Sequence, residues 1–121
     1  MARYVLDLER ETIANNDFRR VIFTGNDLQL VLMTLAPGDE LGAEIHPEHD
    51  QFIRVESGVG QVTLDHRSFP VTHGTAVIVP AGVEHNVVNT SKTQPLRLYT
   101  LYGPPEHATD TIHRTKADAR H

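Results

Sequence analysis

Short runs of apolar and β-branched residues recur along the chain from residue 20 onward, and clusters of turn-forming residues separate them. The breaks carry Gly, Pro, Asp, Asn, Ser or Thr, which have conformational reasons to turn a chain. Evenly spaced short strands with no long helix between them are typical of a jelly roll or a small barrel. We therefore predict an all-β fold with strands at 21–23, 28–35, 43–46, 51–56, 60–64, 69–71, 75–79, 85–89 and 96–102.

The run LQLVLMTL (28–35) is nearly continuous in apolar residues, unlike the alternating runs elsewhere. Such a run predicts a strand that is buried on both faces. A closed barrel would also remove open strand edges, which are prone to aggregate when strands are this apolar.

Both ends of the chain lack this regular pattern. We expect residues 1–19 to form an N-terminal arm, 20–102 a single-domain barrel, and 103–121 a C-terminal arm. The C-terminal arm is expected to lie over the barrel or on a partner chain, as docked termini commonly do. Local patterns within the arms predict a short strand at 4–6 and helical turns at 9–15 and 114–120.

Composition narrows the function classes. The chain has 121 residues, no cysteine and a formal net charge of −5, with 11 Lys and Arg against 16 Asp and Glu. The absence of a basic stripe argues against nucleic-acid binding, and no apolar run approaches the ~20 residues of a membrane-spanning helix. No signal-peptide pattern opens the sequence, so we expect a cytoplasmic protein. Eight histidines are many for this length, and histidine is the commonest metal ligand.

Two segments carry the candidate chemistry. The first, residues 38–58, reads GDELGAEIHPEHDQFIRVESG, and the second, residues 74–89, reads GTAVIVPAGVEHNVVN. Together they resemble the two signature motifs of the cupin family. The second segment matches that family's pattern at every position, whereas in the first Glu44 stands in place of a histidine and Gln51 in place of a glutamate.

The resemblance implies a double-stranded β-helix barrel that binds a divalent metal ion, with Fe, Mn, Ni or Zn as candidates. The flanks NNDFRRVIFTG and YGPPEH are similar to those of small stand-alone bacterial cupins that are labelled similar to mannose-6-phosphate isomerase. It also implies a homodimer formed through sheet faces, for which the apolar run 28–35 offers surface.

Strand geometry independently brings the candidate ligands together. Residues two apart on a strand point to the same face, so Glu44 and His46 project together. His85 begins a predicted strand shortly after the turn Pro80–Gly82, and Gln51 is the first residue of another predicted strand. Two imidazoles, one carboxylate and one amide oxygen then converge, a set close to the two-histidine, one-carboxylate site of non-heme iron oxygenases. A metal-free polar pocket is the alternative, because an amide is a poor ligand.

Other residues have both a structural and a functional interpretation. We expect Glu44 and Tyr102 to act in catalysis, Tyr102 as an acid, base or substrate donor, although packing would also explain Tyr102 and its neighbour Tyr99. His49 and Asp50 are expected in a solvated loop, with substitution for Gln51 as the alternative. The rest have local roles: exposed histidines at His66 and His73, tight turns at Gly58 and Gly82, backbone hydrogen bonding by Asn89, and closure over the barrel mouth by His107 and His113.

Three functions fit these observations. The first is a metalloenzyme that acts on a small oxygenated molecule, as a dioxygenase or as an isomerase or lyase. The second is a non-catalytic cupin that binds a small molecule such as a sugar or another metabolite. The third is a structural dimer whose pocket is vestigial. Of these three, we predict the metalloenzyme.

Overall fold

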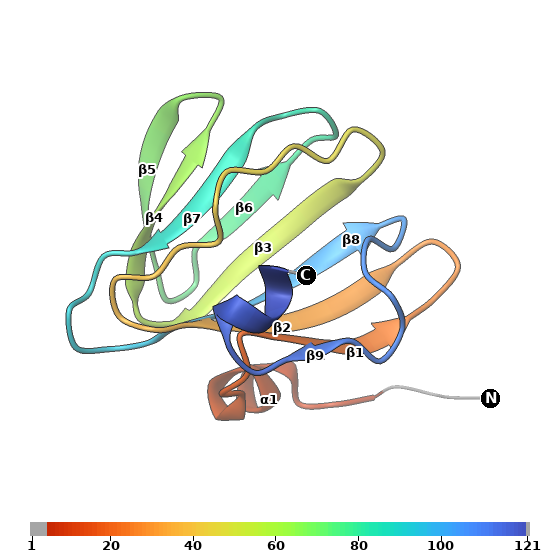
Figure 1. The fold of residues 1–121 in the computed structure, drawn as a ribbon, viewed down its shortest axis with the longest axis horizontal. Helices are drawn as coiled ribbons and strands as arrows, with labels where there is room; N and C mark the ends of the chain where they lie inside the picture. Colours follow the sequence, from red (N-terminus) through yellow and green to blue (C-terminus); the bar gives the residue numbers. More distant parts are fainter. Residues whose placement is uncertain (1–4, 121) are drawn as a thin grey trace.

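Two antiparallel sheets face each other in the computed structural model, which describes residues 5–120 (Figure 1). The larger sheet has the strand order β6-β3-β8-β2-β1-β9, and the smaller has the order β5-β4-β7. The elements are α1 (Leu8–Ala14), β1 (Arg19–Thr24), β2 (Gln29–Leu35), β3 (Asp50–Ser57), β4 (Val59–Leu64), β5 (Arg67–Thr72), β6 (Ala76–Val79), β7 (His85–Asn89), β8 (Leu96–Gly103), β9 (Ile112–His113) and the 3₁₀ helix η1 (Lys116–Arg120). The predicted all-β jelly roll is confirmed.

The core fills the space between the sheets. Alternate residues of each strand point inward, as expected for packed sheets. The larger sheet contributes Val31, Ile53 and Leu98, and the smaller contributes Val62 and Val87, each at most 2% exposed. Strand β2 lies between β1 and β8, and both Val31 and its outward neighbour Leu32 are buried. The prediction that this strand is buried on both faces is therefore confirmed.

The segment 43–46 does not form the strand that its pattern predicts. It makes only an isolated bridge, in which Glu44 pairs with His85. The preceding residues follow the edge of β7 irregularly: the Leu41 amide donates to Val87 O at 2.9 Å, and the Gly42 amide donates to Asn86 Oδ1 at 2.9 Å. The Asn86 side chain thus accepts a hydrogen bond that a backbone carbonyl accepts in a regular β-ladder, and regular strand pairing is interrupted there.

The two arms are more structured than their patterns suggest. The helical turn expected at 9–15 is the helix α1, and that expected at 114–120 is η1. The C-terminal segment also contains β9, which pairs with β1, although no strand was predicted there. Of the strand predicted at 4–6, Tyr4 lies outside the described residues, and Val5 and Leu6 are not in a strand. None of the described helices is both long and apolar enough to cross a membrane.

Local turns behave as the sequence predicts. Gly58 and Gly82 have φ angles of +98° and +87°, which glycine adopts without steric cost. The Asn89 side-chain amide lies 2.9–3.1 Å from the carbonyl oxygens of Leu35, Ala36 and Gln94, so it ties β7 to the ends of two loops.

The two turn glycines allow a matched test of packing. A Cβ at Gly58 would lie 2.5 Å from Pro95 O, whereas a Cβ at Gly82 would have no atom within 4 Å. We expect Gly82→Ala to cost about 1–2 kcal/mol from the left-handed backbone alone. Gly58→Ala should cost about 3 kcal/mol or more, because backbone atoms must also move. Urea unfolding measures both values, and equal costs would contradict this account of the β3–β4 turn.

Candidate metal centre

The backbones of Glu44 and His85 are joined by two reciprocal hydrogen bonds. Each amide donates to the other residue's carbonyl oxygen at 2.9 Å. His46 follows two residues later, and its carbonyl accepts from the Gly82 amide at 2.9 Å, which fixes it against the turn before β7. One ligand atom from each of Glu44, His46 and His85 lies within 4.8 Å of the other two. The structure thus brings together three of the four predicted metal ligands.

His85 presents one ring nitrogen to this cluster. The residue is 1% exposed, and its Nδ1 lies 3.0 Å from Val83 O. Because a carbonyl only accepts hydrogen bonds, Nδ1 carries the proton and Nε2 keeps its lone pair. The buried Nε2 has no hydrogen-bond partner in the described chain. A lone pair held in this way is the usual state of a metal-binding histidine.

His46 has the same arrangement. Its Nδ1 lies 3.5 Å from Glu106 Oε2, so a proton on Nδ1 faces a carboxylate. Its Nε2 lies 3.7 Å from Glu44 Oε2 and is buried without a hydrogen-bond partner among residues 5–120. Carboxylates therefore face both ring nitrogens of His46, and Nε2 is the nitrogen on the Glu44 side of the ring.

Gln51 offers a buried oxygen on the adjacent strand pair. It lies directly opposite Tyr102 in the pairing of β3 with β8. Its amide nitrogen donates to Thr100 Oγ1 at 3.0 Å, which orients the side chain, and its Oε1 has no partner in the described structure. Buried acceptors without partners are rare and call for an explanation.

Tyr102 lies inside the barrel, whereas Tyr99 lies on the outer face. The Tyr102 ring centroid is 5.8 Å from that of His46 and 5.2 Å from that of His107, both edge to face. Burial raises the pKa of the Tyr102 phenol, and the Glu44 carboxylate raises it further. Tyr102 therefore keeps its proton and can donate a hydrogen bond. Tyr99 instead packs against Phe52, with the two ring centroids 6.3 Å apart, away from the cluster.

The C-terminal segment contributes residues that the motif analysis missed. Gln29, fully buried in β2, accepts from the amides of Glu106 and His107 and donates to His107 O at 2.7 Å. These bonds hold Glu106 beside His46 and His107 beside Tyr102. A lone glutamine in an otherwise apolar buried strand was the available signal, since such a group must find partners.

The prediction that His49 lies in a solvated loop is wrong. Its side chain is 14% exposed, with Nδ1 2.6 Å from Pro104 O and Nε2 2.9 Å from Glu106 Oε1. Both contacts come from the C-terminal segment, so the local sequence could not reveal them. Its neighbour Asp50 accepts from the Ala81 amide at 2.9 Å. His66 and His73 are exposed, as expected.

A pocket of about 550 Å³ adjoins the cluster, and Arg19, Glu44, His107, His113 and Lys116 are among its lining residues. Burial lowers the pKa of His107 to about 4, and the Arg19 charge contributes in the same direction. His107 is therefore neutral at pH 7. The pocket therefore brings together the Glu44 carboxylate, the buried Arg19 guanidinium and the imidazoles of His107 and His113.

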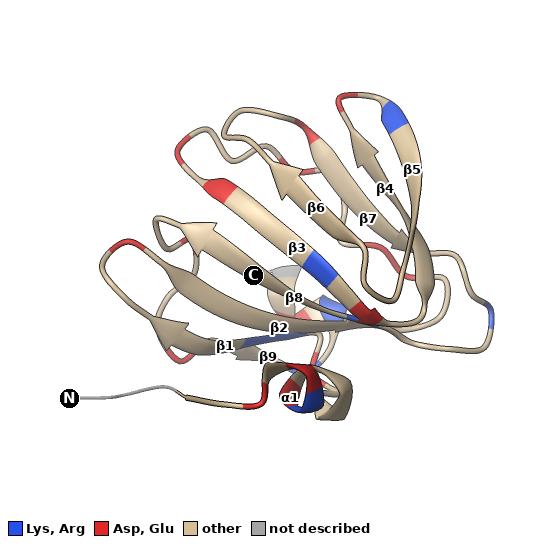
Figure 2. Cartoon of the chain, turned by 180° about the vertical axis from the view of Figure 1, so that it is seen from behind, with Lys and Arg blue, Asp and Glu red and all other residues tan. Residues whose placement is uncertain are grey.

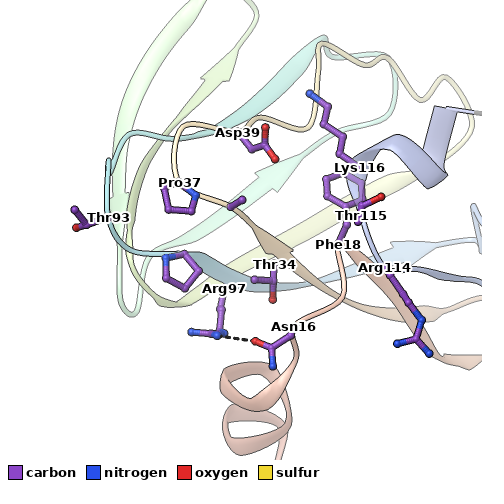
Figure 3. A pocket seen from close by; sticks show the side chains of 12 residues that line it. Asn16, Phe18, Thr34, Pro37, Asp39, Thr93, Arg97, Arg114, Thr115 and Lys116 are labelled. Carbon is purple, nitrogen blue, oxygen red and sulfur yellow. Dashed lines mark hydrogen bonds between the residues drawn. The ribbon is translucent and has the colours of Figure 1, made fainter.

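Two other features are less suited to chemistry. Figure 3 shows a second pocket of about 530 Å³, where Arg97 donates to Asn16 and the lining includes no member of the Glu44 cluster. A second acidic and histidine cluster, Glu9, Glu56 and His73, lies elsewhere, and two of its members are exposed. Its buried member Glu56 already accepts from Arg54 at 3.3 Å.

Comparisons with known proteins agree with this fold. A family model described as Cupin domain matches residues 31–102. The uncharacterized protein YrkC of Bacillus subtilis is 47% identical over 96% of this chain, and the chain spans 65% of YrkC. The crystal structure of BH2720 from Bacillus halodurans has a TM-score of 0.94 and 44% identity, covering 98% of this chain and 93% of that one. The quercetin 2,3-dioxygenase of Bacillus subtilis is 28% identical over 81% of this chain and 29% of its own length.

Proposed function

This chain belongs to the cupin family, and we propose that Glu44, His46, Gln51 and His85 bind one divalent metal ion inside its barrel. The observation that supports this most strongly is the set of buried atoms without partners, His46 Nε2, His85 Nε2 and Gln51 Oε1. Leaving three such atoms unsatisfied would cost free energy in the folded state, whereas a cation would use all three. Two imidazoles with one carboxylate suit iron, and also Mn, Ni or Zn.

We propose that the protein is a metalloenzyme acting on a small oxygenated molecule in the adjoining pocket. A bound metal ion supplies either Lewis acidity toward a carbonyl or enediol, or activation of dioxygen. The first would make the protein an isomerase or lyase, and the second a dioxygenase. The likeness to quercetin 2,3-dioxygenase favours the second.

The surrounding residues have separable roles in this proposal. Tyr102 keeps its proton because burial raises its pKa, so it would donate a hydrogen bond to a substrate oxygen. Glu44 has the most exposed side chain of the three clustered ligands, at 33%, and lines the pocket, so substrate would meet it first. Val83 O and Glu106 would hold the two imidazoles in their binding tautomers.

Metal analysis tests the proposal. Untagged protein purified without chelator should contain about one divalent ion per chain, measured by elemental analysis. The double variant His46→Ala/His85→Ala should lose it. The matched control His66→Ala/His73→Ala removes two exposed histidines and should keep the ion. Metal-free wild-type protein would contradict the proposal and favour a non-catalytic binding module, and unchanged metal in the first variant would contradict the assigned ligands.

Glu106 is proposed as a positioning residue for His46. Removing its charge with Glu106→Gln should weaken metal affinity about 10- to 100-fold, because such outer carboxylates orient the imidazole and raise its basicity. Glu48→Gln, an exposed residue of the nearby loop, is the control and should change affinity little. Titration of chelator-treated protein measures both. If Glu106→Gln binds the metal as tightly as the wild-type protein does, the 3.5 Å contact between Glu106 and His46 does not position the imidazole for metal binding.

We also propose a homodimer formed through the outer face of the larger sheet. Apolar residues gather there around a shallow pocket lined by Leu28, Phe52, Ile78 and Leu101, and Ile78 is 67% exposed. Figure 2 shows that β6 and β2 carry no charged residue and β8 only Arg97, whereas β3, between β6 and β8, carries Asp50, Arg54 and Glu56. Such a patch suits a self-complementary two-fold interface. Leu28 begins the apolar run that was predicted to supply this surface.

Light scattering tests the dimer. Ile78→Arg should convert a dimer to a monomer at micromolar concentration, because it would place like charges opposite each other across the two-fold axis. Ile112→Arg changes another exposed isoleucine, 50% exposed on β9, and should leave the dimer intact. A monomeric wild-type protein, or a dimer that survives Ile78→Arg, would refute this interface.

A further inference from the structure

Arg19 is a buried cation with no anionic partner among residues 5–120. It lies on β1 two residues before the core residue Val21, so both side chains point into the barrel. The residue is 9% exposed. Within the described residues, no carboxylate lies within the 4.0 Å that defines an ion pair with its guanidinium. Buried charges are normally paired, because desolvation strongly disfavours a lone one.

The hydrogen-bonding capacity of this guanidinium is largely unused. Arginine offers five N–H donors. In residues 5–120, NH1 lies 3.2 Å from His113 Nδ1, and the buried Nε has no partner. The guanidinium carbon also lies 5.3 Å from the centroid of the Phe18 ring, a contact that stabilises the cation without consuming a donor. Arg19 is therefore held in place while its donors stay available.

Arg19 lines a pocket that Glu44, the most exposed member of the metal cluster, also lines. That pocket, of about 550 Å³, has Arg19, His107 and His113 among its lining residues, and Glu44 as well. The Arg19 charge acts on both residues that approach His46 from this side, since it contributes to lowering the pKa of His107 and opposes the rise in the pKa of Tyr102. A molecule in this pocket would contact both Glu44 of the metal cluster and the Arg19 guanidinium.

We propose that Arg19 binds the carboxylate of the substrate, which makes the substrate a small oxygenated carboxylic acid such as a 2-hydroxy or 2-oxo acid. The inference rests on the proposed function, because the hydroxyl or oxo oxygen would face Glu44, His46 and His85. A planar guanidinium fork matches a carboxylate with two parallel hydrogen bonds. The pocket also contains the Lys116 side chain, so its cations suit an anionic ligand, whereas a neutral sugar would leave the buried Arg19 charge unpaired.

A structural role for Arg19 is the competing explanation. Its backbone pairs with His113, and its side chain bridges β1 to the C-terminal segment, so it helps to fix β9. That role would make the residue important for stability without any preference among ligands. The two explanations therefore differ in whether binding depends on the charge of the ligand.

Calorimetric binding with paired probes tests the proposal. The probes are pyruvate, lactate and 2-oxoglutarate, and each is compared with its neutral amide. Wild-type protein should bind at least one acid about 10- to 100-fold more tightly than its amide, as expected for hydrogen bonds to a charged group. Arg19→Gln should remove this preference. Arg20→Gln removes the adjacent exposed arginine and should retain it.

Several results would overturn the proposal: no acid of the panel binds, acid and amide bind equally, the preference survives Arg19→Gln, or inorganic phosphate displaces the acids at lower concentration. If Arg19→Gln does not fold, the acid-to-amide ratio in wild-type protein and in Arg19→Lys still decides, because lysine keeps the charge but lacks the fork. Metal content is measured on the same samples and after chelation. Metal binding without acid preference refutes only this inference, and acid preference without metal refutes only the proposed function.

Discussion

The reciprocal backbone hydrogen bonds between Glu44 and His85 are the interaction on which the site depends. They join a segment without regular strand structure to the start of β7, and so fix a carboxylate and an imidazole side by side. His46 follows two residues further along, where its carbonyl accepts from the Gly82 amide. The result is a buried set of ring nitrogens that find no hydrogen-bond partner within residues 5–120. Burial without a partner makes the lone pairs of these nitrogens unfavourable in free energy, and a bound cation would remove that cost. The folded backbone that buries them is thus also what would favour binding of a metal ion.

The C-terminal segment is part of the site and not only a cover. Gln29 holds the backbone at Glu106 and His107 from the centre of the larger sheet. Through that anchor, Glu106 reaches both His46 and His49, and His107 packs against Tyr102. The pocket wall that includes His107 and His113 is built by the same segment, together with Arg19 of β1. The positions of Glu106 beside His46 and of His107 in the pocket wall therefore depend on a few hydrogen bonds made by one buried glutamine.

Much of the barrel could be predicted because strand periodicity and turn residues are local signals. The run 28–35 indicated a doubly buried strand, and β2 is one. The motif spacing indicated that Glu44, His46 and His85 converge, and their ligand atoms do lie together. What could not be predicted depends on contacts between residues far apart in the chain. His49 is partly covered through its contacts with Pro104 and Glu106, and β9 pairs with the free edge of β1. Just before segment 43–46, the Gly42 amide donates to the Asn86 side chain instead of to a strand carbonyl.

The position of a bound metal ion decides whether Glu44, His46 and His85 form a metal centre. Crystals grown from manganese-loaded protein, with diffraction data collected where manganese scatters anomalously, would locate the ion without assumptions about its ligands. The account predicts one strong anomalous peak within coordinating distance of Glu44, His46 Nε2 and His85 Nε2, with Gln51 Oε1 facing it. A peak only at the Glu9, Glu56 and His73 cluster, or no ordered peak at any site, would contradict it.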